Sequence, residues 1–198
     1  MVRFGIALLV VGGVMGFFGI QECRLRSAAS TTPQEISLKD LIAHGPENNA
    51  HVIVKDYSLC ENFIYEKPEK SNADTWNKVW IPAVPAQANA QQKNGLAAKP
   101  NHVDALIKSK HVHKESELAR LAGPTVQGMV VNKIESLGSE EKKKLSETYP
   151  GTDFSKCLII EEGREPAGPG KLAALVGGGL LLLLVGGAVA LFGFTRRK

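Results

Sequence analysis

Two apolar blocks at the ends of the chain constrain its fold more than any other feature. Residues 4–20 and 172–194 contain no charged side chain. At about 1.5 Å rise per residue, helices of these lengths match a hydrocarbon core of roughly 30 Å. We therefore expect transmembrane helices at residues 1–20 and 172–194. The chain has 198 residues, which leaves room for one domain of ordinary size between them.

The N-terminal block has two interpretations, a retained anchor and a cleaved signal peptide. Arg3 followed by an apolar run is how a signal peptide begins. The run is followed by a polar stretch with Glu22 and two arginines, and not by a small-x-small cleavage site, which favours retention. Cys23 follows Glu22, whereas a lipid-attachment cysteine would follow a small residue.

Charge predicts the orientation of the chain and excludes one class of partner. Residues 195–198 form a basic tail, and such ends stay in the cytoplasm, so both termini are expected there. Residues 21–171 then face the periplasm or an equivalent compartment. All 20 acidic residues lie between the apolar blocks with 20 of the 24 Lys and Arg, so this region is formally neutral. Because a nucleic-acid interface needs clustered basic residues, we expect no nucleic-acid partner.

Small residues recur at four-residue spacing in both apolar blocks. Gly12 and Gly16 form one such pair, and Gly186 and Ala190 form another. This spacing allows close helix packing in lipid, either between the two helices or against a partner. The alternative is that glycine-rich segments produce the spacing by chance. Membrane lipid and a membrane-protein partner or a second copy are the expected partners.

The central region predicts an α+β domain. We expect a juxtamembrane linker at 21–35, the domain at 36–163, and a second linker at 164–171. Short β-branched or aromatic runs predict strands at residues 51–57, 63–65, 76–82, 103–108, 126–131 and 157–160. Capping and stop signals predict helices at residues 37–45, 114–121 and 139–148, with Ser37 and Ser139 as caps.

The order of these elements predicts the type of sheet. Strands cluster without regular alternation with helices, which favours a mostly antiparallel sheet or a small barrel. Pro82 and Pro85 predict that strand 76–82 ends at a sheet edge. Residues 86–101 have little apolar periodicity and predict an exposed loop.

Few residues in the central region form a chemical motif. His111 and His113 would share a face of an extended chain, as two metal ligands should, but no third ligand stands at a recognisable spacing. We therefore expect a solvated pair, no metal and no cofactor. Cys60 and Cys157 are either one disulfide or two buried thiols, and the second interpretation is slightly favoured. Glycine-rich phosphate loops and hydrolase or zinc motifs are absent from this region of the sequence.

Two tryptophans complete the set of candidate site residues. Trp76 and Trp80 are four residues apart and would lie on one face of a strand, as a partner surface or as core. The plan of two terminal spans around a β-rich domain resembles that of the Surfeit-locus cytochrome oxidase assembly factors. The resemblance is one of architecture alone and assigns no residue a role.

Three classes of function remain open from the sequence. The favoured one is a double-anchored scaffold or assembly protein without catalytic activity. The alternative is a membrane-bound enzyme that uses His111, His113, Cys157 or a carboxylate. A transport component is the third, but the apolar blocks contain no charged residue that would line a polar pathway.

Overall fold

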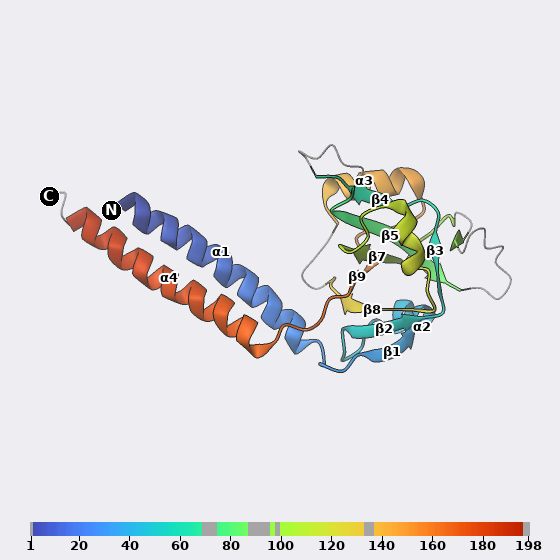
Figure 1. Ribbon diagram of the computed structural model, residues 1–198, viewed down its shortest axis with the longest axis horizontal. Helices are drawn as coiled ribbons and strands as arrows, with labels where there is room; N and C mark the ends of the chain where they lie inside the picture. The colour runs from blue at the N-terminus through green and yellow to red at the C-terminus, as the bar shows by residue number, and fades with distance from the viewer. Residues whose placement is uncertain (1, 69–74, 87–95, 98–99, 133–136, 196–198) are drawn as a thin grey trace. The chain divides into compact units, whose positions relative to one another are not determined.

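The chain forms two compact units. The computed structural model describes residues 2–68, 75–86, 96–97, 100–132 and 137–195 (Figure 1). One unit comprises Met1–Ala28 and Pro166–Lys198, and the other comprises Ala29–Glu165. The first is a helical hairpin, and the second is an α+β domain, which is the fold class that the sequence predicts.

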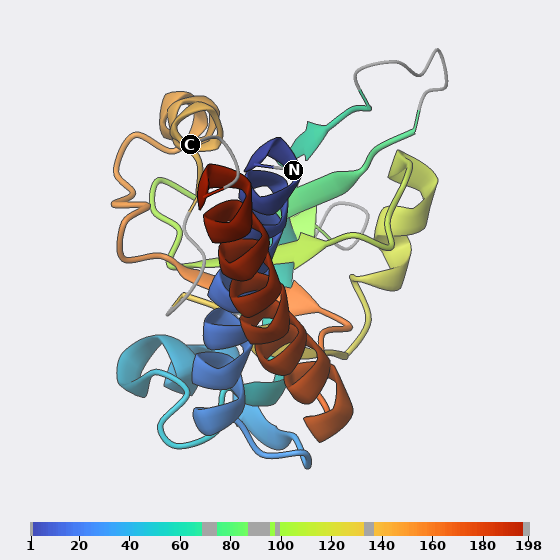
Figure 2. The same ribbon diagram turned by 90° about the vertical axis from the view of Figure 1, so that its left-hand side faces the viewer.

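The hairpin consists of helices α1 (Val2–Ser27) and α4 (Pro169–Thr195). They lie side by side and antiparallel, with both chain ends at the same end of the hairpin (Figures 1 and 2). Both are long and apolar enough to cross a membrane. Both also extend into the predicted linkers. Arg24 and Arg26 lie in the last turn of α1, where their charges interact favourably with the negative end of the helix dipole. Pro169 begins α4, where the N–H that proline lacks would have no partner within the helix.

The domain is built on one mixed, nine-stranded sheet. The strand order is β1 (Gln34–Ser37), β2 (His51–Lys55), β8 (Thr125–Val130), β9 (Leu158–Glu162), β7 (Ala105–Ser109), β5 (Lys78–Pro85), β3 (Tyr57–Cys60) and β6 (Leu96–Ala97), and β4 (Ile64–Glu66) also pairs with β5. Five of the eight pairings are antiparallel, and β1–β2, β3–β6 and β7–β9 are parallel. No pairing between described strands closes the sheet into a barrel.

Short helices lie where the capping signals predict them. The Ser37 hydroxyl accepts a hydrogen bond from the Asp40 N–H and caps α2 (Leu38–His44), and Gly45 ends this helix at a φ of 71°. Helix α3 (Ser139–Thr148) begins at Ser139, but its cap residue is Gly138, so the prediction of a serine cap was wrong. Residues Glu115–Arg120 form a 3₁₀ helix, η1.

A single backbone position divides the first predicted strand. Asp56 has a φ of 55°, which aspartate tolerates better than most residues. The chain turns there, so β2 pairs with β1 and β8, whereas β3 pairs with β5 and β6. Residues 51–57 therefore supply two strands at separate places in the sheet.

Strand β5 corrects the prediction that residues 76–82 end at an edge. The strand lies inside the sheet and continues through Pro82 to Pro85. On one side it pairs with β7 along Val79–Ala83; on the other it pairs first with β4 and then with β3. Pro82 lies at the change from β4 to β3, where no partner residue is in register on that side. A proline lacking an N–H is tolerated at such a break in the ladder.

The core of the domain is mostly apolar. Its fully buried large side chains include Leu38, Leu41, Leu59, Ile81, Leu106, Ile107, Met129, Leu145 and Ile160. Burial of each such side chain contributes about 1.5–3 kcal/mol.

Residues 87–95 and 98–99 of the predicted 86–101 loop lie outside the described residues, and Leu96–Ala97 pairs with β3 as β6.

Candidate functional site

Glycines at seven-residue spacing form the contact between the two long helices. Gly5, Gly12 and Gly19 of α1 are buried. A Cβ atom added at Gly12 would lie 2.9 Å from the Gly179 carbonyl oxygen of α4, closer than real Cβ contacts allow. On α4, Gly179, Gly186 and Gly193 approach α1 in the same way. The absence of side chains at these positions therefore lets the two backbones touch.

The four small residues that the sequence predicts for helix packing, Gly12, Gly16, Gly186 and Ala190, have different positions in this contact. Gly12 and Gly186 face the opposite helix, and the Ala190 backbone lies against Gly5. A Cβ at Gly16 would point into open space, although its backbone N lies 2.8 Å from the Cβ position of Gly179. The seven-residue repeat, which the sequence analysis did not use, is the signal that identifies the whole contact.

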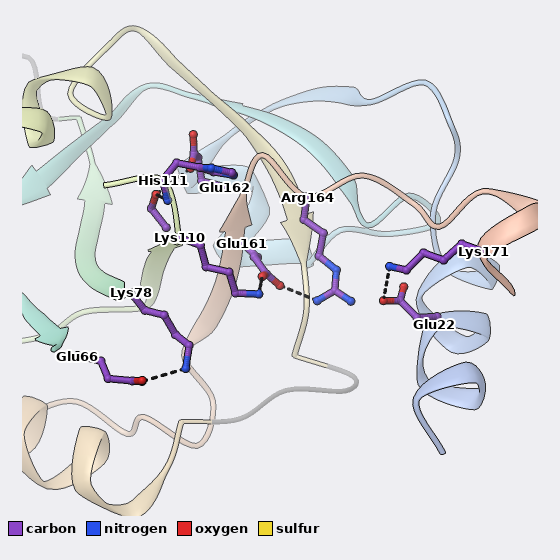
Figure 3. A network of polar contacts seen from close by, with 10 residues as sticks. Glu22, Glu66, Lys78, Lys110, His111, Glu161, Glu162, Arg164 and Lys171 are labelled. Atoms are coloured by element: carbon purple, nitrogen blue, oxygen red, sulfur yellow. Dashed lines mark hydrogen bonds and ion pairs between the residues drawn. The ribbon is translucent and has the colours of Figure 1, made fainter. Parts of the chain in front are cut away.

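Polar contacts join α1 and α4 at the end opposite the chain termini. Lys171 Nζ lies 3.1 Å from Glu22 Oε1 (Figure 3). Arg26 Nη1 donates a hydrogen bond of 2.5 Å to the Ala167 carbonyl oxygen. Glu22 and Arg26 follow the apolar stretch of α1, and Lys171 directly precedes that of α4, so these groups lie where interfacial water would solvate charge.

A buried ion cluster lies where the parallel strands β7 and β9 end together. The Glu161 side chain is 5% exposed and contacts Lys110 Nζ at 2.5 Å and Arg164 Nη1 at 2.6 Å (Figure 3). Burial alone raises the pKa of Glu161, but the hydrogen bonds from Lys110 and Arg164 and the charge of Lys108 lower it to about 2. Glu161 is therefore ionised at neutral pH and acts as a structural anion, not as a proton donor.

The neighbouring Glu162 belongs to a second set of polar contacts. Ser109 Oγ donates to Glu162 Oε2 at 2.8 Å, and Arg120 Nη2 lies 3.6 Å from Glu162 Oε1. The Tyr57 hydroxyl donates to the Leu121 carbonyl oxygen at 2.5 Å. Burial, and then the charge of Glu162, raise the pKa of Tyr57 to about 12, so this tyrosine stays protonated.

The two candidate histidines have separate surroundings. His113 Nδ1 donates to the Trp76 carbonyl oxygen at 2.8 Å, whereas His111 lies beside Gly163 after β9. Both side chains are exposed. Within the described part of the chain, no group of three or more His, Cys, Asp or Glu residues is arranged to hold a metal ion. The absence of a metal in the protein stays a prediction.

Trp76, one of the two tryptophans predicted as partner surface or core, belongs to an aromatic cluster with Phe63 and Tyr65. Trp76 precedes β5, Trp80 lies within it, and both are buried. Tyr65 stacks on Trp76 with ring centroids 4.7 Å apart, and Phe63 packs on the same indole at 5.4 Å. Tyr65, 43% exposed, presents the cluster to solvent. The signal in the sequence for this surface is the alternation of Phe63, just before β4, with Tyr65 within it.

Cys60 and Cys157 are free, buried thiols in the structure. Burial raises the pKa of Cys60 to about 11, and a hydrogen bond with Tyr149 lowers it only in part. Burial, and then the charge of Asp104, raise the pKa of Cys157 to about 12. Both groups are therefore protonated at neutral pH, which makes them poor nucleophiles and poor metal ligands. These properties suit a packing role better than the thiol chemistry of the alternative enzyme.

Thiol labelling distinguishes buried thiols from a disulfide. In the native protein without reductant, we expect rapid labelling of the exposed Cys23 alone. After denaturation without reductant, we expect all three of the chain's cysteines to react. Labelling of one cysteine in the denatured protein, rising to three with reductant, would establish a Cys60–Cys157 disulfide. A Cys23→Ser variant controls for bonds between chains.

Comparison with known proteins assigns no function to this chain, so a function is inferred from the sequence and the structure. No protein-family model matches the chain, and no curated protein or solved structure matches it.

Proposed function

We propose that this chain is a double-anchored membrane protein whose domain, residues 29–165, is a non-catalytic scaffold or assembly module. The observation that carries the proposal is the glycine-packed pair of apolar helices. Their outer faces expose large apolar side chains, among them Phe4, Val10, Phe17, Leu180, Leu184 and Leu191. An apolar surface of this kind is unfavourable in water and favourable in lipid.

The proposed topology places both termini in the cytoplasm and the domain on the other side. The antiparallel pairing of α1 and α4 supports a common side for the termini (Figure 1). The basic residues at 196–198 support the cytoplasm as that side. Two anchors confine the domain to the membrane surface, which raises its effective concentration for other membrane-bound molecules.

The aromatic cluster is the proposed partner surface. Exposed aromatic side chains backed by buried ones are typical of the residues that dominate binding energy at protein interfaces. Tyr65 has this arrangement because Trp76 supports its ring from below. The expected partner is another membrane protein or a second copy of this chain.

Extraction and crosslinking test the proposal in two steps. The full-length chain is expected to stay in the membrane pellet after alkaline carbonate and high-salt washing, and its recovery in the soluble fraction would contradict double anchoring. A photo-crosslinking amino acid at position 65 is expected to capture a membrane protein or a second copy. The same group at the exposed position 35 serves as the control, and equal capture at both positions would contradict the proposed surface.

A further inference from the structure

A cleft of about 290 Å³ opens beside the Glu162 end of β9. It lies between the start of β8, η1 and the residues that follow β9. Sites for small molecules have volumes of about 300–1,000 Å³, so this cleft suits a ligand at the small end of that range. Its lining includes the charged Arg120, Glu162 and Glu165 and the apolar Leu121 and Val126.

Glu162 is held in place for binding. Its Oε2 accepts the hydrogen bond from Ser109, whose side chain is fully buried, and the Glu162 side chain itself is only 17% exposed. Its Oε1 lies 3.6 Å from Arg120 Nη2, which is beyond hydrogen-bond length. The carboxylate is therefore oriented, and Oε1 retains capacity to accept from a ligand.

Arg120 provides an adaptable cation on the same wall. Its side chain is 54% exposed and lies 3.6 Å from Glu162, and a guanidinium has five donors with which it can also bind a ligand. A guanidinium binds a carboxylate most strongly through two parallel hydrogen bonds. Arg120 can make this contact with a ligand while it remains close to Glu162.

The lining groups specify the charge pattern of a ligand. The charged residues of the lining are one arginine and two glutamates, and the lining also includes the apolar Leu121 and Val126 and the neutral polar Thr125 and Gln127. The complementary molecule has one carboxylate, two cationic groups and an aliphatic chain. A free basic amino acid has this composition.

We propose that the cleft binds a free basic amino acid, such as arginine or lysine. Arg120 binds the carboxylate of the ligand, Glu162 accepts from its α-ammonium group, and Glu165 pairs with its side-chain cation. Leu121 and Val126 contact the aliphatic chain. This ligand site is separate from the scaffold role and from the aromatic cluster.

Calorimetric titration of the full-length protein in detergent tests the site with L-arginine and L-lysine. Two analogues separate the contributions: norleucine lacks the side-chain cation, and cadaverine lacks the carboxylate. Each is expected to bind at least about tenfold more weakly than lysine, because one charge-assisted contact is lost. Absence of arginine and lysine binding up to about 10 mM, or norleucine binding as tightly as lysine, would overturn the proposal.

Two conservative variants locate the site. Arg120→Gln and Glu165→Gln are each expected to weaken lysine binding at least about tenfold. Both side chains are exposed, so urea unfolding is expected to give unchanged midpoints, which separates loss of binding from loss of fold. Glu35→Gln, on β1, is the matched control. Unchanged affinity in both cleft variants would overturn the proposal, whatever the outcome of the membrane extraction.

Discussion

Replacement of Glu161 by glutamine is expected to destabilise the domain by about 3 kcal/mol. The carboxylate lies between Lys110 and Arg164, and Lys108 is itself buried close by. Glutamine keeps the shape of the side chain but removes the charge that stabilises the buried Lys108 and the largely buried Arg164. Urea unfolding followed by tryptophan fluorescence measures the change. The chain's two tryptophans, Trp76 and Trp80, both lie in the domain, so the signal reports on its unfolding.

Glu35→Gln is the matched control for this substitution. Glu35 also pairs with a lysine, at 3.6 Å from Lys55 Nζ, but its side chain is 67% exposed. A solvent-exposed pair contributes about 0–1 kcal/mol, so this variant is expected to unfold at nearly the wild-type urea concentration. Equal stability of the two variants would contradict a structural role for the Glu161 cluster.

The same carboxylate predicts a dependence of stability on acid. The pKa of Glu161 is about 2 in the folded protein and near 4.5 in the unfolded chain, so the unfolded state binds the proton more readily. The stabilisation is therefore complete above about pH 5 and is lost as the pH falls toward 2, with a contribution on the order of 2 kcal/mol after solvent screening. In the Glu161→Gln variant, the free energy of unfolding is expected to fall less steeply between about pH 5 and pH 2. An equally steep decline in the variant would assign the acid sensitivity to other carboxylates.

Local signals predicted the elements of this fold better than their arrangement. The cap at Ser37 and the stop at Gly45 depend on neighbouring residues, and the structure confirms both. Two other features depend on which strands pair with these segments. They are the division of residues 51–57 at Asp56 and the position of Pro82 inside the sheet. Those strands are distant in sequence, so no local pattern contains the information.

The polar clusters were missed for the same reason. Lys110 directly follows β7, and Glu161 lies near the end of β9. The two residues become neighbours only because β7 and β9 pair in parallel. In the sequence, each looks like one more exposed charge. For Trp76, the spacing from Trp80 allowed either a partner surface or the core, and only the packing of Tyr65 on the buried indole distinguishes the two.

The contact between α1 and α4 predicts different effects for two adjacent glycines. A Cβ at Gly12 would lie 2.9 Å from backbone atoms of Gly179 and Leu183, whereas a Cβ at Gly13 would meet nothing within 4 Å. Gly12→Leu and Gly13→Leu change hydrophobicity and helix propensity equally. Only the first is expected to force the helices apart, at a cost of about 1–3 kcal/mol and by about 2–3 Å.

Spin labels near the far end of the hairpin measure this separation. Glu22 and Lys171, whose side chains meet at 3.1 Å, are changed to cysteine for labelling in a Cys23→Ser background. The buried Cys60 and Cys157 are not expected to react. Strong dipolar broadening is expected in the parent and in Gly13→Leu, and weaker broadening in Gly12→Leu. The same spectrum from both glycine variants would contradict packing of the helices through glycine, because the added leucine at position 12 has no space unless the backbones move apart.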